Sequence, residues 1–243
     1  MIIYIDRMRK NATSVGEMQW PFLQSCLQTR RKLLFLGESG SGKTELSVNF
    51  ALYYAGGQSK PVHFFDLDQT KPLFRARNQG AVLLQAGVEL HHSEITLDIP
   101  APPGGLNEKL ADQGCVCILD VGGNLNGARL AGCFAEHFLS ADSLTFYLIN
   151  IYRAWAHTAE LIGETMSQVL AAGGQSEPFI IANPNFGQST TSRDIVHGLK
   201  ETEEMLSSLG LRSGALAVRE DLLSPELAAL HERILPVRQY FVH

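Results

Sequence analysis

The chain has 243 residues, of which 45% are hydrophobic and 19% are charged, and its 20 basic and 25 acidic residues give a formal net charge of −5. This length fits one or two domains and the apolar fraction is enough for a sizeable core, so disorder along the whole chain is excluded. The acidic balance argues against nucleic-acid binding, and no apolar run is long enough to span a membrane, so we expect a soluble globular protein.

Short apolar runs alternate with longer amphipathic ones along most of the chain. This alternation is typical of βαβ units, so we expect a single α/β domain over residues 1–243, with a mostly parallel sheet and helices on both faces. The predicted strands are Lys32–Leu36, Val62–Asp66, Val88–His92, Cys115–Asp120, Leu144–Ile149, Phe179–Ala182 and Ala215–Val218. The predicted helices are Lys43–Ala55, Leu73–Leu84, Asn126–Phe138, Ala156–Ala172 and Thr190–Leu209.

Three segments fall outside this alternation. Residues 1–30 form an N-terminal extension, in which Met1–Asp6 resembles a strand and Pro21–Gln28 a helix, so an extra edge strand with a covering helix is expected. Ile99–Gly105 (IPAPPGG) is too rich in proline and glycine for regular structure and predicts a rigid surface connection. Ile234–Val242 contains Pro236, which argues against a membrane-surface helix and favours a docked final segment.

The strongest motif is Gly37–Thr44 (GESGSGKT), which matches the phosphate-binding pattern G-x-x-x-x-G-K-[ST]. It lies between a predicted strand and a predicted helix, as that pattern requires. Its glycines let backbone N–H groups turn inward around an anion at a helix N-terminus, Lys43 reaches the β/γ-phosphates, and Thr44 ligates Mg²⁺. The predicted nucleotide-contacting residues of this loop are Gly37, Glu38, Ser39, Gly40, Ser41, Gly42, Lys43, Thr44 and Glu45.

Acidic residues follow two of the predicted strands. Asp66 and Asp68 form a D-x-D at the end of one strand, where alternation aims both carboxylates the same way if the strand runs through them. Asp120 ends an apolar strand and precedes Gly122-Gly123, which is typical of a Walker B carboxylate followed by a switch loop. The structural alternatives are a solvated strand-end turn for the pair and a helix cap for Asp120.

This set of motifs resembles the MinD/ParA branch of SIMIBI-class P-loop ATPases, from about Lys32 onward. The resemblance implies ATP and Mg²⁺ as cofactors and a slow ATPase that acts as a switch on a protein partner, with a nucleotide-dependent homodimer. It implies a catalytic set of Lys43, Asp66 and Asp68, in which Asp68 positions the hydrolytic water. It also implies that Asp120 holds a magnesium-bound water, completing a metal set of Thr44, Asp66 and Asp120.

The same resemblance assigns adenine recognition to Asn183, which ends the strand Phe179–Ala182. The guanine-reading N-K-x-D is absent, because Pro184-Asn185-Phe186 follow Asn183. ATP is therefore preferred over GTP, although an Asn-Pro pair also starts ordinary turns.

One position departs from the family pattern. Members of the branch carry a second lysine directly after the first P-loop glycine, whereas this chain has Glu38. A carboxylate there repels phosphate, so a nucleotide-binding regulatory module without hydrolysis is one alternative. A small-molecule phosphotransferase is another, because Ile99–Gly105 with Arg75 and Arg77 could form a substrate lid. Arg75 and Arg77, just after the D-x-D, are candidate replacement cations.

Cysteine and histidine carry weaker signals. The four cysteines are too few and scattered for a secreted disulfide framework, and no signal peptide starts the chain, so we expect a cytoplasmic protein. Cys115-x-Cys117 lies inside a predicted strand and is interpreted as buried rather than metal-binding. His91 and His92 with Glu94 are interpreted as a solvated strand end, because adjacent strand residues face opposite sides.

Overall fold

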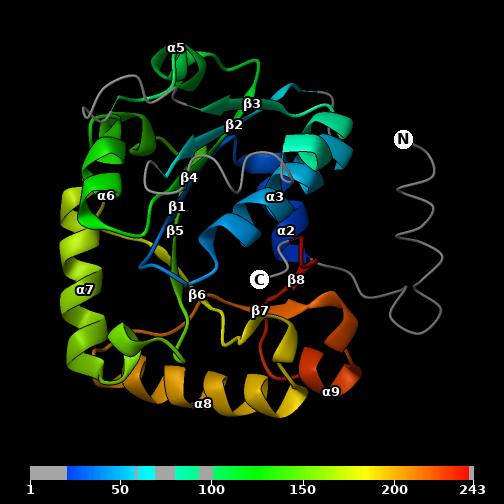
Figure 1. The fold of residues 1–243 in the computed structure, drawn as a ribbon, viewed down its shortest axis with the longest axis vertical. Coiled ribbons are helices and arrows are strands. Elements are labelled where there is room, and N and C mark those ends of the chain that lie inside the picture. The colour runs from blue at the N-terminus through cyan, green and yellow to red at the C-terminus, as the bar shows by residue number, and fades with distance from the viewer. Residues whose placement is uncertain (1–20, 58–59, 69–79, 93–100, 241–243) are drawn as a thin grey trace.

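The computed structural model describes residues 21–57, 60–68, 80–92 and 101–240. Within these residues, eight parallel strands form one sheet in the order β3-β2-β4-β1-β5-β6-β7-β8 (Figure 1). The carboxyl ends of all eight strands therefore lie along the same edge of the sheet. The strands are β1 Lys32–Leu36, β2 Val62–Leu67, β3 Glu89–His92, β4 Val116–Val121, β5 Ser143–Ile149, β6 Phe179–Ala182, β7 Ala215–Arg219 and β8 Ile234–Val237.

Helices connect these strands and cover the sheet. The α-helices are α2 Pro21–Thr29, α3 Lys43–Gly57, α5 Leu106–Ala111, α6 Leu125–Gly132, α7 Ala159–Ala172, α8 Ser192–Ser208 and α9 Pro225–Ala228. Short 3₁₀ turns follow at η1 Ala135–Phe138, η2 Ala154–Ala156, η3 Gly187–Ser189 and η4 Glu220–Leu222. No helix among the described residues has the length and hydropathy needed to cross a bilayer.

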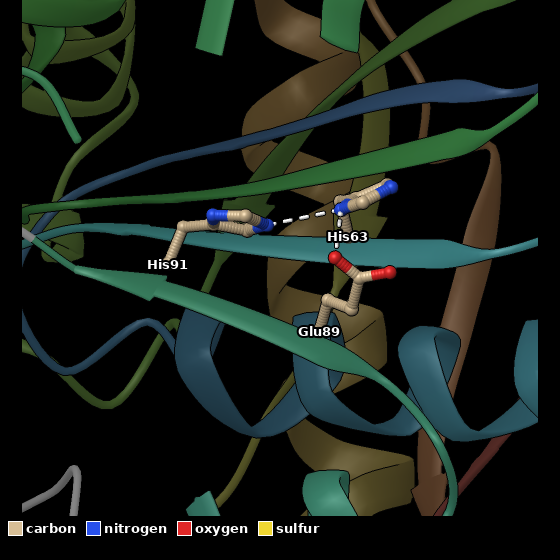
Figure 2. A group of neighbouring side chains, drawn as sticks. All are labelled: His63, Glu89 and His91. Atoms are coloured by element: carbon tan, nitrogen blue, oxygen red, sulfur yellow. Dashed lines mark hydrogen bonds and ion pairs between the residues drawn. The ribbon is translucent and has the colours of Figure 1, made fainter. Parts of the chain in front are cut away.

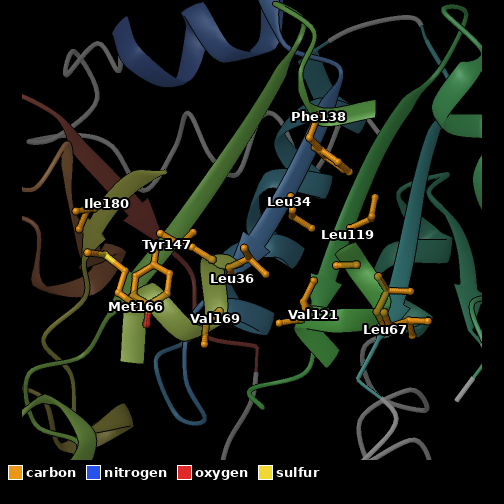
Figure 3. Close-up of a cluster of buried hydrophobic side chains, with 14 of the residues drawn as sticks. Leu34, Leu36, Leu67, Leu119, Val121, Phe138, Tyr147, Met166, Val169 and Ile180 are labelled. Carbon is orange, nitrogen blue, oxygen red and sulfur yellow. The ribbon is translucent and has the colours of Figure 1, made fainter. Parts of the chain in front are cut away.

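Both faces of β1 are buried, which explains why residues 33–36 are all apolar. Alternating residues of β1 enter two different cores: Leu34 and Leu36 pack with residues of α6 and α7, whereas Leu33 and Phe35 pack with residues of α3. Figure 3 shows the first of these cores, in which side chains of several neighbouring strands meet on one face. The predicted α/β architecture with helices on both faces is confirmed.

The predicted strands correspond closely to the observed ones. Lys32–Leu36 and Phe179–Ala182 match β1 and β6 at both ends, and the other five differ by one residue at one end or at both. Ile234–Val237 is an eighth strand, which the sequence indicated only as a docked segment. Pro236 is tolerated there because β8 lies at the edge of the described sheet.

Three helix predictions need correction. Asn126–Phe138 is not one helix, because α6 ends at Gly132 and η1 begins only at Ala135. Ala156 belongs to η2, and α7 begins after Thr158, whose hydroxyl accepts a hydrogen bond from the Leu161 N–H and caps the helix. The helix predicted at Thr190–Leu209 is α8, and both of these end residues lie just outside it. Helix α5, directly after the proline-rich connection, was not predicted. Of predicted helix Leu73–Leu84, only residues 80–84 are described, and they are helical.

The helix predicted within the N-terminal extension is present and is tied to the core. Leu23 and Cys26 of α2 are buried, and the Tyr54 hydroxyl of α3 donates to the Cys26 carbonyl at 2.7 Å. Phe22 stacks on Phe179 with ring centroids 4.5 Å apart. Helix α2 therefore covers the sheet as expected, while the predicted strand at Met1–Asp6 lies outside the described residues.

Candidate nucleotide-binding site

A cavity of about 710 Å³ opens at the carboxyl edge of the sheet. Its wall combines the loop after β1 with residues of β7 and β8 and with residues that follow β2, β4, β5 and β6 in the chain, so it crosses much of the sheet. The sequence-predicted residues that line it are Ser39, Gly40, Gly42, Lys43, Thr44, Glu45, Asp68 and Asn183. Its size is that of a cofactor or small-ligand pocket.

The loop Gly37–Thr44 has the backbone of an anion-binding turn. Gly37, Gly40 and Gly42 have φ values of 135°, 78° and 96°, which side-chain-bearing residues rarely adopt. Helix α3 begins at Lys43, so the positive end of its dipole favours a bound anion. Lys43 Nζ donates to the Glu38 carbonyl at 2.8 Å, which places the ammonium against the loop.

Side chains from the segments that follow β5 and β6 hold the carbonyl groups of this loop. The Asn183 amide donates to the Ser41 carbonyl at 2.7 Å, and Arg153 Nε donates to the Gly40 carbonyl at 3.1 Å. Trp155 Nε1 donates to the Ser39 carbonyl at 3.1 Å, and Asn150 adds a weaker bond to Gly40 at 3.3 Å. These bonds engage the carbonyl groups of three successive loop residues, and backbone N–H groups are what binds an anion in a turn of this kind.

Sequence reasoning missed Asn150, Arg153 and Trp155. Asn150 directly follows β5, whose residues are almost all buried, and it is itself fully buried. A polar residue at the end of a buried strand is the signal that finds this part of the site, because parallel strands deliver such residues to one edge. Arg153 lines the cavity beside Gly40.

Asp120 is the most unusual carboxylate of the site. It is 1% exposed, and its buried Oδ1 has no hydrogen-bond partner among the described residues. Burial, followed by the negative charge of Asp66, raises the pKa of Asp120, while a hydrogen bond with Thr44 and the charge of Lys43 lower it less. A buried carboxylate oxygen without a hydrogen-bond partner fits a site completed by a cation.

Asp66 and Asp68 both lie near Asp120, but the backbone at the end of β2 differs from the prediction. Strand β2 ends at Leu67, so Asp68 lies beyond it and strand alternation does not orient its side chain. Instead, the Asp66 carboxylate accepts a hydrogen bond from the Asp68 N–H at 2.9 Å and fixes the turn. Both negative charges act on Asp120, so the three predicted carboxylates do converge.

The loop after β4 lies directly on the phosphate loop. A Cβ atom at Gly123 would be 2.6 Å from the backbone of Ser39, and one at Gly122 would be 3.1 Å from the Asp68 carboxylate. Only glycine allows so close an approach. The structure thus places the predicted switch loop between the phosphate loop and Asp68.

Amide and aromatic groups line the far end of the cavity, after β6. Asn183, Asn185 and Gln188 line it, and Phe186 stacks on Tyr152 with ring centroids 4.1 Å apart. Arg219 also lines it, but its guanidinium is held by both Asp221 oxygens and by the carbonyls of η3. The side chains of Asn183, Asn185 and Arg219 are thus all engaged in hydrogen bonds within the protein.

Other predicted residues lie away from the cavity or outside the description. Arg75, Arg77 and Glu94 are not among the described residues. Cys115 and Cys117 are buried within the core, and in the described part of the chain neither belongs to a group that can hold a metal. The interpretation of His91 as a solvated strand-end residue is wrong. Its side chain is only partly exposed, and its ring stacks on that of Phe65 with ring centroids 4.4 Å apart.

Comparisons with known proteins support the fold. No family model and no curated protein matches the chain. The crystal structure of the cell division protein FtsY from Thermotoga maritima matches with a TM-score of 0.50 and 16% identity, over 82% of this chain and 68% of that one. FlhF in complex with GTP and Mg²⁺ gives a TM-score of 0.43 and 13% identity, over 82% and 79%. The likeness to FtsY shows that this chain has the same α/β fold, with a parallel sheet flanked by helices.

Proposed function

We propose that this chain is a magnesium-dependent nucleotide switch that binds and hydrolyses ATP and acts on a protein partner. The observation that carries the proposal is the buried, unpartnered Oδ1 of Asp120 next to the phosphate loop. A hydroxyl and two carboxylates, from Thr44, Asp66 and Asp120, are the oxygen ligands that Mg²⁺ prefers. When bound, Mg²⁺ would neutralise charge on the phosphates and polarise them toward attack by water.

The chain's own residues supply the remaining functions. The N–H groups of the phosphate loop and Lys43 bind the phosphates, and Asp68 orients the attacking water through its carboxylate. The loop after β4 contacts both the phosphate loop and Asp68. A change of phosphate state at this point would therefore alter the position of that loop, which is how we propose that a partner senses the nucleotide.

Arg153 is our candidate for the cation that replaces the missing family lysine. Among the described residues that line the cavity, the cations are Lys43, Arg153 and Arg219. Lys43 belongs to the loop itself, and Arg219 is occupied by Asp221 and η3. Arg153 is exposed and lies at Gly40, so its guanidinium can turn from the carbonyl to a phosphate oxygen.

Adenine is the base that we favour. Asn and Gln side chains pair with the N6 and N7 groups of adenine, whereas guanine is most often read by Arg or Lys. The cavity wall carries the amide side chains of Asn183, Asn185 and Gln188, and the arginine beside them, Arg219, is paired with Asp221. This argument concerns the described residues and extends the preference for ATP drawn from the missing N-K-x-D.

Phosphate release from Mg-ATP and Mg-GTP, measured over a range of protein concentrations, tests the proposal. Asp68→Ala should abolish release, while Asp112→Ala, an exposed aspartate at the opposite edge of the sheet, should leave it unchanged. Activity per subunit that rises with concentration would support an ATP-dependent dimer. ATP binding without phosphate release at any concentration would contradict hydrolysis and favour the regulatory alternative, and transfer to an added acceptor would favour a phosphotransferase.

A further inference from the structure

Two histidines and a glutamate meet on the outer strands of the sheet, away from the nucleotide cavity. In the parallel pairing of β2 with β3, His63 lies opposite Glu89 and Phe65 lies opposite His91. Because side chains alternate along a strand, these residues share one face of the sheet. Figure 2 shows the imidazoles of His63 and His91 and the Glu89 carboxylate turned toward one another.

The distances within this cluster are those of a ligand set. His63 Nδ1 and His91 Nε2 are 2.9 Å apart, and His63 Nδ1 is 3.3 Å from a Glu89 oxygen. One donor atom from each residue lies within 4.8 Å of the other two. Ligand atoms about 2.0–2.1 Å from a tetrahedral Zn²⁺ ion are about 3.3 Å from one another, so only small side-chain movements are needed to hold one ion.

The surroundings fix the two rings. His63 is 1% exposed, and the ring of His91 stacks on Phe65 with an interplanar angle of 14°. Burial lowers the pKa of both histidines, and the positive charge of Lys109 lowers both further, against the opposing effect of Glu89. Both imidazoles are therefore neutral at neutral pH, and neutral imidazole is the form that binds metals.

The carboxylate leaves the cluster open on one side. The Glu89 side chain is 59% exposed, so an ion can enter from solvent, with water as an additional ligand. In the metal-free form one proton lies between His63 Nδ1 and His91 Nε2. Ligation of both nitrogens requires this proton to move to the other nitrogen of its ring, which leaves both imidazoles neutral and releases no proton.

We propose that His63, Glu89 and His91 bind a divalent transition-metal ion of the Zn²⁺, Co²⁺ and Ni²⁺ class. Two imidazole nitrogens and one carboxylate oxygen suit these ions and discriminate against Mg²⁺, which prefers oxygen ligands alone. The site is distinct from the proposed magnesium site, although both lie on β2. The transition-metal site uses His63 near the start of β2, whereas Asp66 of the magnesium site lies near the end of β2.

Titration of the full chain with Co²⁺ in saturating Mg²⁺ tests this site, since Mg²⁺ occupies the oxygen-ligand site first. The wild type should bind one Co²⁺ with visible d–d absorption, and Zn²⁺ should displace it. His91→Gln and Glu89→Gln should each weaken binding by at least about tenfold. His92→Gln, the neighbour on the opposite face of β3, is the matched control and should bind as tightly as the wild type.

A further variant, at a residue outside the proposed ligand set, tests how the charge around the two imidazoles affects metal binding. Lys109→Gln removes a positive charge that acts on both imidazoles, so it should tighten binding by about threefold. Glu89 is largely exposed, so its variant tests the ligand role without disturbing the core. Wild-type affinity weaker than about 100 μM, or equal affinity in the Glu89→Gln and His92→Gln variants, would overturn the proposal.

Discussion

The two edges of the sheet treat buried charge in opposite ways. At the amino edge, Arg31 and Lys32 are 8% and 4% exposed, and both pair with Asp142, at 2.5 and 3.2 Å. At the carboxyl edge, Asp120 is equally buried but its Oδ1 has no partner in the described structure. A buried ion pair that loses one partner leaves an uncompensated charge, and a buried carboxylate oxygen without a partner costs stability unless a ligand binds. We therefore expect substitutions at the amino edge to affect stability most, and substitutions of Asp120 to affect ligand binding most.

Asp120→Asn tests the carboxyl edge and should have the largest effect of the variants proposed. It should reduce Mg²⁺-dependent phosphate release by about 10- to 100-fold, because it removes a charge from the metal set. It should also stabilise the nucleotide-free protein. The pKa of Asp120 is raised by burial and by Asp66, so its contribution to stability is present at low pH and is lost as the pH rises through the raised pKa. Thermal unfolding from pH 4 to 8, with phosphate release, checks both effects.

The asparagine variant should therefore lose much of the pH dependence of stability that the wild type shows without Mg²⁺. Asp112→Asn serves as the control, because this residue is exposed at the other end of the molecule. An Asp120→Asn protein that is less stable than the wild type at pH 8 would show that Asp120 is compensated in the folded protein, and the contrast between the edges would fail.

Asp142→Ala tests the amino edge. It leaves two buried cations without their partner, so we expect a loss of about 2 kcal/mol in the free energy of unfolding, reduced from fully buried values because Asp142 is 33% exposed. Hydrogen bonds from Ser140 and Lys32 and the charge of Arg31 outweigh burial and lower the pKa of Asp142. Its contribution should be present above the ordinary carboxyl range and be lost as the pH falls through the lowered pKa.

Urea unfolding at pH 7 and pH 3 measures this effect, and Ser207→Ala, on an exposed position of α8, is a suitable control. Phosphate release per folded molecule should be unchanged. An Asp142→Ala protein that keeps wild-type stability but releases phosphate more slowly would show that Asp142 contributes to function and not to stability. The contrast between the two edges would then fail.

Arg153→Ala sharpens the functional side of the comparison. The arginine is exposed and bonds only weakly to the Gly40 carbonyl, so its removal should change stability little. If it stabilises charge during hydrolysis, turnover should fall by about tenfold, the worth of one charge-assisted hydrogen bond. Arg153→Lys should restore part of the rate. The control Arg193→Ala alters an exposed arginine on α8, and equal rates in the two alanine variants would contradict the role.

Asn183→Ala should have the smallest effect. The loss of one neutral hydrogen-bonding group is worth about 1 kcal/mol, so we expect the KM for ATP to rise by about fivefold and the preference for ATP over GTP to narrow. Initial rates with both nucleotides measure this change. Asn107→Ala, on α5 at the other side of the molecule, controls for nonspecific loss. An unchanged nucleotide preference would leave Asn183 as a support of the Ser41 carbonyl alone.

Local sequence patterns were enough to predict the phosphate loop and seven of the eight described strands. Residues 33–36 of β1 are all apolar because both faces of the strand are buried, and the glycine spacing of the loop has few other uses. The order of strands was not predictable, because pairing of β1 with β4 and β5 depends on segments far apart in the chain. The same reason hid Arg153, which reaches the loop from β5, and the meeting of His63 with His91, which depends on register.

The sheet order also determines when the chain can fold during synthesis. All five residues of β1 are buried, and both of its neighbours, β4 and β5, are made later than β1 itself. A ribosome therefore exposes an apolar strand and the complete phosphate loop long before either partner exists. Parallel pairings between strands that are far apart in the chain form late in folding. The intermediates that precede them expose apolar surface and tend to aggregate. We expect that a chain stalled before Ser143 exposes β1 and depends on chaperones, whereas a chain extended past Ile149 can bury it.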